Sequence, residues 1–106
     1  MPKYLIQGSY SDQGLKDLLE EGGSKRREAA EQSVKGLGGR LEAFYYAFGK
    51  HDFVVIADLP SNVDATALSL TANMSGTVKS RMTVLITPEE VDQGTKRTVK
   101  FRPPGK

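Results

Sequence analysis

The clearest structural signal in the sequence is the stretch RLEAFYYAFGKHDFVVIADL at residues 40–59. Two runs rich in aromatic and β-branched residues, 40–48 and 52–59, flank a short Gly-Lys-His link, and this composition and spacing are typical of a β-hairpin. Apolar side chains occupy both alternating sets of positions in the first run. One set is Phe44, Tyr46 and Phe48, and the other is Leu41, Ala43 and Tyr45. We therefore expect paired strands whose sheet is apolar on both faces.

A further strand precedes this hairpin, and two helical segments separate them. Residues 3–10 carry apolar side chains on both alternating sets, which is typical of a central strand. Ser11 or Asp12 can cap a short helix that the pair Gly22-Gly23 ends. Ser24 can cap a second helix that runs to about residue 37.

The segment after the hairpin predicts one more helix and one more strand. Ser61 and Asp64 form a capping pattern behind Pro60, and Gly76 closes the helix. The residues expected on its packed face are Val63, Ala67, Leu70 and Met74. Residues 77–87 then alternate between apolar and polar side chains, so this strand has a core face and a wetter face. Thr87 can cap a final short turn.

The order β-α-β-β-α-β closes most simply as a ferredoxin-like sandwich of the α+β class, with an antiparallel four-stranded sheet. We expect the strands in the order fourth, first, third, second, with the helical segments on one face. The other face is then bare although it carries apolar side chains, and such a face usually marks an interface or a ligand groove. The hypothesis that follows is a symmetric homodimer in which two bare faces pack together.

Composition excludes several classes of site. The 106 residues suit one domain, and the chain has one His and no Cys, which excludes disulfides, iron–sulfur clusters, thiolate zinc sites and a zinc site built from several histidines of one chain. We expect no cofactor and no bound metal. No apolar run is long enough to span a membrane, and the N-terminus leads directly into a strand without a signal peptide, so we expect a cytoplasmic protein.

Charge divides the chain at Gly94. Residues 1–93 hold ten Lys and Arg against thirteen Asp and Glu, a net charge of −3, whereas residues 94–106 hold five basic residues and no acidic one. We interpret residues 1–93 as the folded domain and residues 94–106 as a basic, solvated tail. An alternative is that residues 98–101, which alternate in polarity, add a short strand to a neighbouring sheet. Nucleic-acid binding is a weaker alternative, since five charges are few for that function.

Four stretches of the sequence resemble the GYD domain family. They are YSDQG at 10–14, LGGRL at 37–41, FYYAFGKHDFVVIAD at 44–58 and RMTV at 81–84. His51 stands where the family's Gly-x-Tyr-Asp turn has tyrosine. The resemblance covers about residues 3–92 and implies a dimeric α/β barrel, but no established activity. Related barrels include cofactor-free monooxygenases, isomerases, haem-handling enzymes and ligand-binding stress proteins, which bind their ligands between the sheet and the helices.

Six residues are candidates for a site. His51 has the one side chain that normally titrates near neutral pH, and with Asp52 beside it could act as a general base. The alternative is an exposed turn histidine, with Asp52 accepting backbone N–H groups to fix the hairpin. The phenols of Tyr10, Tyr45 and Tyr46 could line a cavity for an aromatic ligand, or simply pack the core and the dimer.

Arg81 is the strongest candidate for a cation that binds a carboxylate or enolate oxygen; the alternative is an ion pair across an interface. Taken together, these features predict a small homodimeric α/β-barrel protein that binds a small apolar or aromatic molecule. Catalysis is an open question, with cofactor-free oxygenation or isomerisation as the chemistry that the related barrels imply. The alternative function is a non-catalytic interaction or assembly protein.

Overall fold

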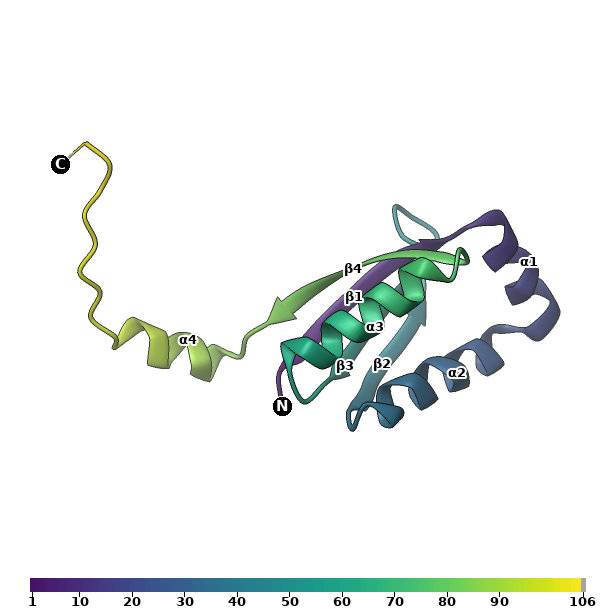
Figure 1. The fold of residues 1–106 in the computed structure, drawn as a ribbon, viewed down its shortest axis with the longest axis horizontal. Helices are drawn as coiled ribbons and strands as arrows, with labels where there is room; N and C mark the ends of the chain where they lie inside the picture. The colour runs from purple at the N-terminus through teal and green to yellow at the C-terminus, as the bar shows by residue number, and fades with distance from the viewer. Residues whose placement is uncertain (106) are drawn as a thin grey trace.

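The computed structural model describes residues 1–105, which form a four-stranded antiparallel sheet with helices on one face (Figure 1). The elements are β1 (Lys3–Tyr10), α1 (Asp12–Glu21), α2 (Gly23–Gly36), β2 (Arg40–Tyr46), β3 (Phe53–Asp58), α3 (Asn62–Met74), β4 (Val78–Leu85) and α4 (Pro88–Thr95). The strand order β2-β3-β1-β4 confirms the predicted ferredoxin-like arrangement. Lys106, the last basic residue of the predicted tail, lies outside the described residues.

Polar side chains begin three of the four helices. The hydroxyls of Ser11 and Ser61 each accept a backbone N–H in the first turn of α1 and α3, and Thr87 forms a reciprocal capping box with Glu90 at the start of α4. The predicted cap at Ser24 is wrong, because α2 already begins at Gly23 and has no side-chain cap. The predicted short turn after Thr87 is an eight-residue helix.

A β-bulge in β2 changes which of its side chains share a face. The register with β3 shifts between Leu41 and Ala43, so that Leu41 points to the same side as Phe44 and Tyr46. The predicted alternation had placed Leu41 with Ala43 and Tyr45, and it is wrong at this position because one extra residue in a bulge reverses the alternation. β2 also ends at Tyr46, which leaves Phe48 outside the sheet.

The core lies between the sheet and the helices. Its buried apolar residues are Tyr4, Ile6, Val34, Phe53, Val55, Ala57, Leu59 and Ala65. The predicted packed face of α3 is wrong: Val63, Leu70 and Met74 are 78%, 62% and 84% exposed. The helix instead turns Ala65 and Leu68 towards the sheet.

The opposite side of the sheet, called here the open sheet face, carries no helix (Figure 1). The strand registers place two cross-strand rows in its centre, Ala43–Ile56–Leu5–Thr83 and Tyr45–Val54–Gln7–Arg81. β1, β2 and β3 therefore contribute apolar side chains to the middle of this face, and β4 contributes polar ones along its edge. The polar side of the fourth strand is as predicted, but its expected core side is only partly confirmed: Val78 and Met82 pack against the core, whereas Val84 and Ile86 are 55% and 63% exposed.

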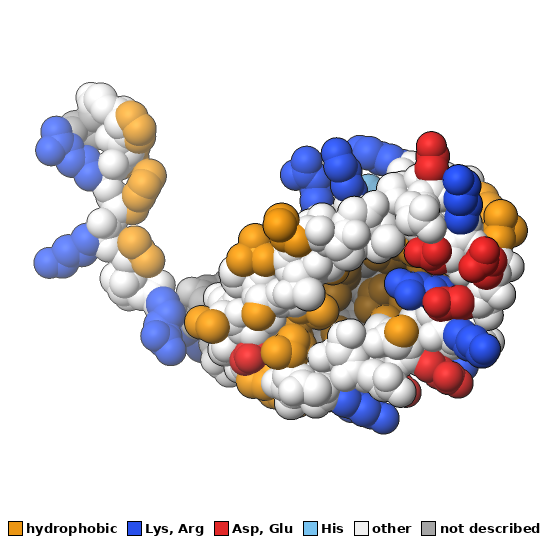
Figure 2. All heavy atoms as spheres, turned by 45° about the vertical axis from the view of Figure 1, so that its right-hand side comes forward, with side chains coloured by type: hydrophobic (Ala, Val, Ile, Leu, Met, Phe, Trp, Pro, Cys, Tyr) orange, Lys and Arg blue, Asp and Glu red, His pale blue; other side chains and the backbone are white. Residues whose placement is uncertain are grey.

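A C-terminal arm, residues 86–105, extends away from the sheet and includes α4 (Figure 1). All twenty of its residues are exposed. In the space-filling view its basic side chains project from one edge and apolar side chains lie along the other (Figure 2). The sheet ends at Leu85, so the chain leaves the packed domain a few residues before the charge boundary at Gly94.

A candidate binding cavity between the sheet and the helices

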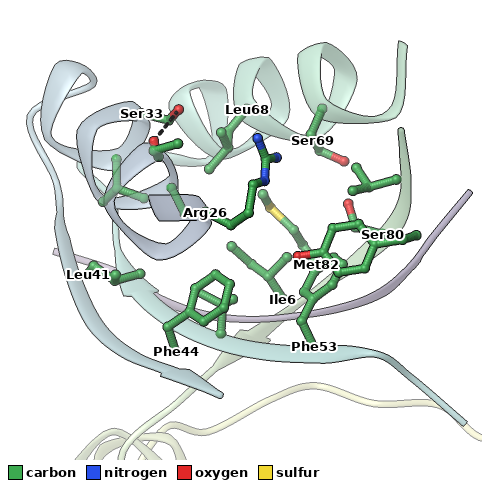
Figure 3. Close-up of a pocket in the computed structure, with 17 residues that line it drawn as sticks. Ile6, Arg26, Ser33, Leu41, Phe44, Phe53, Leu68, Ser69, Ser80 and Met82 are labelled. Carbon is green, nitrogen blue, oxygen red and sulfur yellow. Dashed lines mark hydrogen bonds between the residues drawn. The ribbon is translucent and has the colours of Figure 1, made fainter. Parts of the chain in front are cut away.

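A cavity of about 320 Å³ opens between the sheet and the helices α2 and α3. It is visible as a hollow with a hydrophobic floor in Figure 2 and in close-up in Figure 3. The strands contribute a floor of apolar side chains, among them Ile6, Phe44, Phe53, Val55 and Met82. Small-molecule sites commonly have volumes from about 300 Å³ upwards and apolar walls, so the size and lining are those of a site for a small ligand.

Small side chains on the two helices leave this volume open. α2 packs along β2 and α3 packs along β4, the two edge strands, so the helices lie over opposite edges of the same sheet face and leave a gap between them. The helical wall of the cavity consists mainly of Ala29, Ala30, Ser33, Ser69 and Ala72. Larger side chains at these positions would fill the gap, because protein interiors normally pack to the density of organic crystals.

Arg26 supplies the one charged group among the residues that line the cavity. Its side chain leaves the first turns of α2 and points across the cavity towards Leu68 on α3 (Figure 3). The residue is half-buried, and its Nη1 lies 3.7 Å from Glu21 Oε2.

Tyr10 lines the same cavity from the end of β1, where its ring packs at 5.2 Å from that of Phe53. Burial, with a smaller contribution from the neighbouring Tyr46, raises the pKa of Tyr10 to about 12, although the Arg26 charge opposes the shift. Tyr10 is therefore a neutral phenol at physiological pH. It can donate a hydrogen bond to a ligand, but it is a poor proton acceptor.

Tyr46 stands beside the cavity, at the junction of α1 and α2. Its hydroxyl donates a hydrogen bond to the Gly23 carbonyl oxygen at 3.0 Å, and its ring lies edge-on to Phe44. Of the three tyrosines singled out in the sequence, Tyr10 and Tyr46 thus lie on the helix side of the sheet, next to the cavity. The hydrogen bond to Gly23 connects Tyr46 on β2 to the start of α2, which is a structural role.

Tyr45 and Arg81 lie on the open sheet face, on the opposite side of the sheet from the cavity. They belong to one cross-strand row, with Tyr45 opposite Val54 on β3 and Arg81 opposite Gln7 on β1. Tyr45 is 69% exposed. The structure therefore does not bring all of the predicted ligand-binding residues to a single site.

Asp52 tethers the β2–β3 hairpin to the end of β1. Its Oδ2 accepts the backbone N–H of Tyr10 at 2.9 Å, and its own N–H donates to the Gly8 carbonyl at 2.8 Å. This is the backbone role that the sequence suggested as the alternative to catalysis.

His51 lies next to Asp52 in a separate, wide hollow of about 600 Å³ at the end of the open sheet face. That hollow is basic, because Lys50, Lys79 and Arg81 line it as well. His51 and Asp52 are not among the residues that line the cavity beneath the helices. A catalytic role for the pair stays a prediction.

Among residues 1–105, no three His, Asp or Glu side chains cluster closely enough to hold a metal ion. None of the helices in the described part of the chain combines the length and the apolar character that a membrane span requires.

Sequence reasoning missed the cavity and its cation. Alanine and serine are ordinary helix residues, so Ala29, Ser33 and Ala72 gave no signal until the helices were placed over the sheet. Arg26 stands in the charged run SKRRE at residues 24–28, where it resembles a solvated helix residue. The one available hint was position, because Arg26, Ala30 and Ser33 follow one another at helical spacings of four and three.

Comparison with known proteins agrees with the sequence resemblance. No curated protein matches the chain. The model of the GYD domain family matches residues 4–94, which include the sheet, α1, α2, α3 and most of α4. The matched region contains both the cavity and the β2–β3 hairpin. Because the match extends over most of its length, the chain belongs to the GYD domain family.

Proposed function

We propose that the protein is a homodimer in which each protomer binds a small apolar or aromatic molecule in the cavity between the sheet and the helices α2 and α3. The observation that carries this proposal is the cavity itself, with an apolar floor, small residues on both helices and a single charged group. The hollow around His51 is a weaker candidate, because several basic side chains line it and it lies on the sheet face that the dimer would cover.

A cavity-filling substitution tests the proposal. Ala72 lines the cavity, whereas Ala67 lies on the exposed side of the same helix. We expect Ala72→Phe to abolish the binding of a bicyclic aromatic probe such as 1-naphthoate, and Ala67→Phe to leave it unchanged. Amide chemical shifts in an NMR titration report the affinity and show that each variant is folded. Equal binding by both variants, or no binding by the wild-type protein, would contradict the proposal.

The finer proposal is cofactor-free oxygenation or keto–enol isomerisation of the bound molecule. Both reactions require a proton acceptor, and the seventeen lining residues include no Asp, Glu or His. The cavity therefore supports binding better than turnover. Where a turnover assay exists, His51→Ala and Tyr46→Phe test it: unchanged rates in both variants would remove these residues from the mechanism.

A second function, assembly, is favoured by the C-terminal arm. Val99 and Phe101 are 75% and 73% exposed and alternate with basic residues, which is the pattern of a segment that docks on another surface. We propose a second copy of this chain as the partner, since the arm is basic and residues 1–93 are acidic overall. Deletion of residues 94–106 is then expected to lower the mass measured by light scattering, and an unchanged mass would contradict assembly through the arm.

A further inference from the structure

The side chains that line the cavity include one positive charge and no negative charge. Arg26 is the one ionised side chain among the lining residues, and the remaining polar groups are the hydroxyls of Tyr10, Ser33, Ser69 and Ser80. A cationic ligand would find no lining carboxylate to neutralise it. An anionic ligand would find a guanidinium in an apolar setting, where a charge-assisted hydrogen bond is strongest.

The position of Arg26 leaves most of its hydrogen-bonding capacity directed at the cavity. A guanidinium has five N–H donors in a planar fork. The ion pair with Glu21 involves Nη1 at 3.7 Å, which is longer than a hydrogen bond, and Glu21 is an exposed residue at the end of α1. The side chain reaches from α2 over the cavity towards Leu68 (Figure 3), so a bound ligand would lie between the guanidinium and the apolar floor.

Tyr10 adds a neutral donor beside the cation. It lies close enough to Arg26 for the guanidinium charge to act on its pKa, yet burial keeps the phenol protonated. An oxyanion with two acceptor oxygens could therefore accept hydrogen bonds from both residues, while its apolar part rests on Phe53, Val55 and Met82. Planar two-oxygen anions are the groups that an arginine fork binds best.

We propose that the ligand of this cavity is an apolar or aromatic acid whose carboxylate, or equivalent enolate oxygens, binds to Arg26 and Tyr10. The inference rests on the proposed binding function and adds the chemical class of the ligand. It assigns the anion-recognising role to Arg26, in place of Arg81 on the opposite side of the sheet.

Two probes of nearly equal shape separate charge from fit. 1-Naphthoate carries the carboxylate, and 1-naphthylmethanol replaces it with a neutral alcohol. We expect naphthoate to bind the wild-type protein about ten-fold or more tightly than the alcohol, because a hydrogen bond to a charged group contributes about 1.5–3 kcal/mol. The affinities are measured by NMR titration of the full-length chain.

Substitution of Arg26 then identifies the residue responsible. Arg26→Gln is expected to reduce the affinity for naphthoate to that for the alcohol, without changing the affinity for the alcohol. Arg26→Lys should restore part of the preference. Arg27→Gln is the matched control, since Arg27 is the next residue of α2, is exposed and does not line the cavity. It should leave both affinities unchanged.

The possible failures are distinguishable. If the two probes bind the wild-type protein equally well, the cavity binds small molecules but the inference about charge is wrong. If Arg27→Gln removes the preference as fully as Arg26→Gln does, the effect comes from the net charge of the surface and the inference is again wrong. If neither probe binds, the proposed binding function fails and this inference fails with it.

Discussion

The Asp52 side chain accepts a hydrogen bond from the Tyr10 backbone N–H. Substitutions of Asp52 can distinguish this structural role from a catalytic one. Asp52→Ala removes the acceptor and leaves a partly buried N–H without its partner, so we expect the free energy of unfolding to fall by about 1–3 kcal/mol. Asp52→Asn keeps an acceptor oxygen and should cost less than half as much. Urea unfolding followed by circular dichroism measures both.

The control for these variants is Asp92→Ala in α4, where the carboxylate is exposed and the expected change is within about 0.5 kcal/mol. An Asn variant as unstable as the Ala variant would show that the charge of Asp52, and not its acceptor oxygen, is what matters. That outcome would favour the site role with His51.

Tyr10 couples the stability of the fold to alkaline pH. Its pKa is raised from 10.0 to about 12, first by burial and then by Tyr46. The unfolded chain therefore releases this proton at a lower pH than the folded protein. The contribution to stability is fully present below pH 10, and it is lost as the pH rises from 10 towards about 12.

We expect the free energy of unfolding to fall more steeply with pH in the wild-type protein than in Tyr10→Phe over this interval. The phenylalanine keeps the ring contact with Phe53 but has no proton to release. Urea unfolding at about pH 9 and about pH 11.5 measures the difference, and the other titrating groups cancel between the two proteins. Parallel pH profiles would mean that the Tyr10 hydroxyl is solvated in solution.

At the scale of the elements, two helical glycines predict opposite effects of the same substitution. Gly14 in α1 approaches the Thr77 carbonyl so closely that a Cβ would clash with the backbone, whereas a Cβ at Gly36, at the end of α2, would meet nothing within 4 Å. We expect Gly14→Ala to destabilise the protein by about 1–3 kcal/mol through overpacking. Gly36→Ala should stabilise it by up to about 1 kcal/mol, because alanine favours the helix.

Thermal unfolding of the two variants checks this pair. Similar shifts in both melting temperatures would show that α1 does not pack against the β4 entry as described. The Ser11 N–H, which donates to the same Thr77 carbonyl at 2.9 Å, explains why α1 begins so close to β4.

The elements themselves could be predicted from sequence, because strand alternation and capping residues are local signals. The faces of the elements could not always be predicted. Val63, Leu70 and Met74 have the spacing of one helix face, yet all three side chains are exposed in the structure. A single bulge also moved Leu41 to the face of the sheet opposite the predicted one. Both errors have the same cause: the side of an element that packs is decided by tertiary neighbours and not by periodicity alone.

The candidate site was only partly predictable for a related reason. Tyr10 was recognised because a buried phenol is chemically distinctive. The cavity, by contrast, exists because the facing sides of α2 and α3 carry mainly alanine and serine and few large side chains. A gap arises from the relative placement of two helices that are far apart in sequence. Arg26 belongs to the site only through that placement.

At the scale of the whole molecule, many large apolar side chains of the single chain are exposed. Among residues 1–105 there are fourteen of them, against eight buried hydrophobic residues in the core. Three of them lie on the outer side of α3 and four on the C-terminal arm, whereas Tyr45 is the one that belongs to the central rows of the open sheet face. The open sheet face also carries the half-buried Leu5, Val54 and Ile56, which no helix covers, and an apolar centre beside a polar edge is the usual anatomy of an interface.

Tyr45 offers the sharpest test of a dimer formed through this face. It is 69% exposed in the single chain, so an isolated protomer would tolerate Tyr45→Lys with a change in stability within about 0.5 kcal/mol. In a dimer, the same substitution buries a charge on each side of the contact. We expect it to convert a dimer into a monomer in sedimentation experiments at micromolar concentration. Leu19→Lys on α1, at an apolar position that is 86% exposed, should leave the mass unchanged. Ile56→Lys, in the neighbouring row of the same face, should act like Tyr45→Lys. A wild-type monomer, or a dimer that survives both sheet-face substitutions and is lost with Leu19→Lys, would place the contact elsewhere and remove the open sheet face from the proposed homodimer.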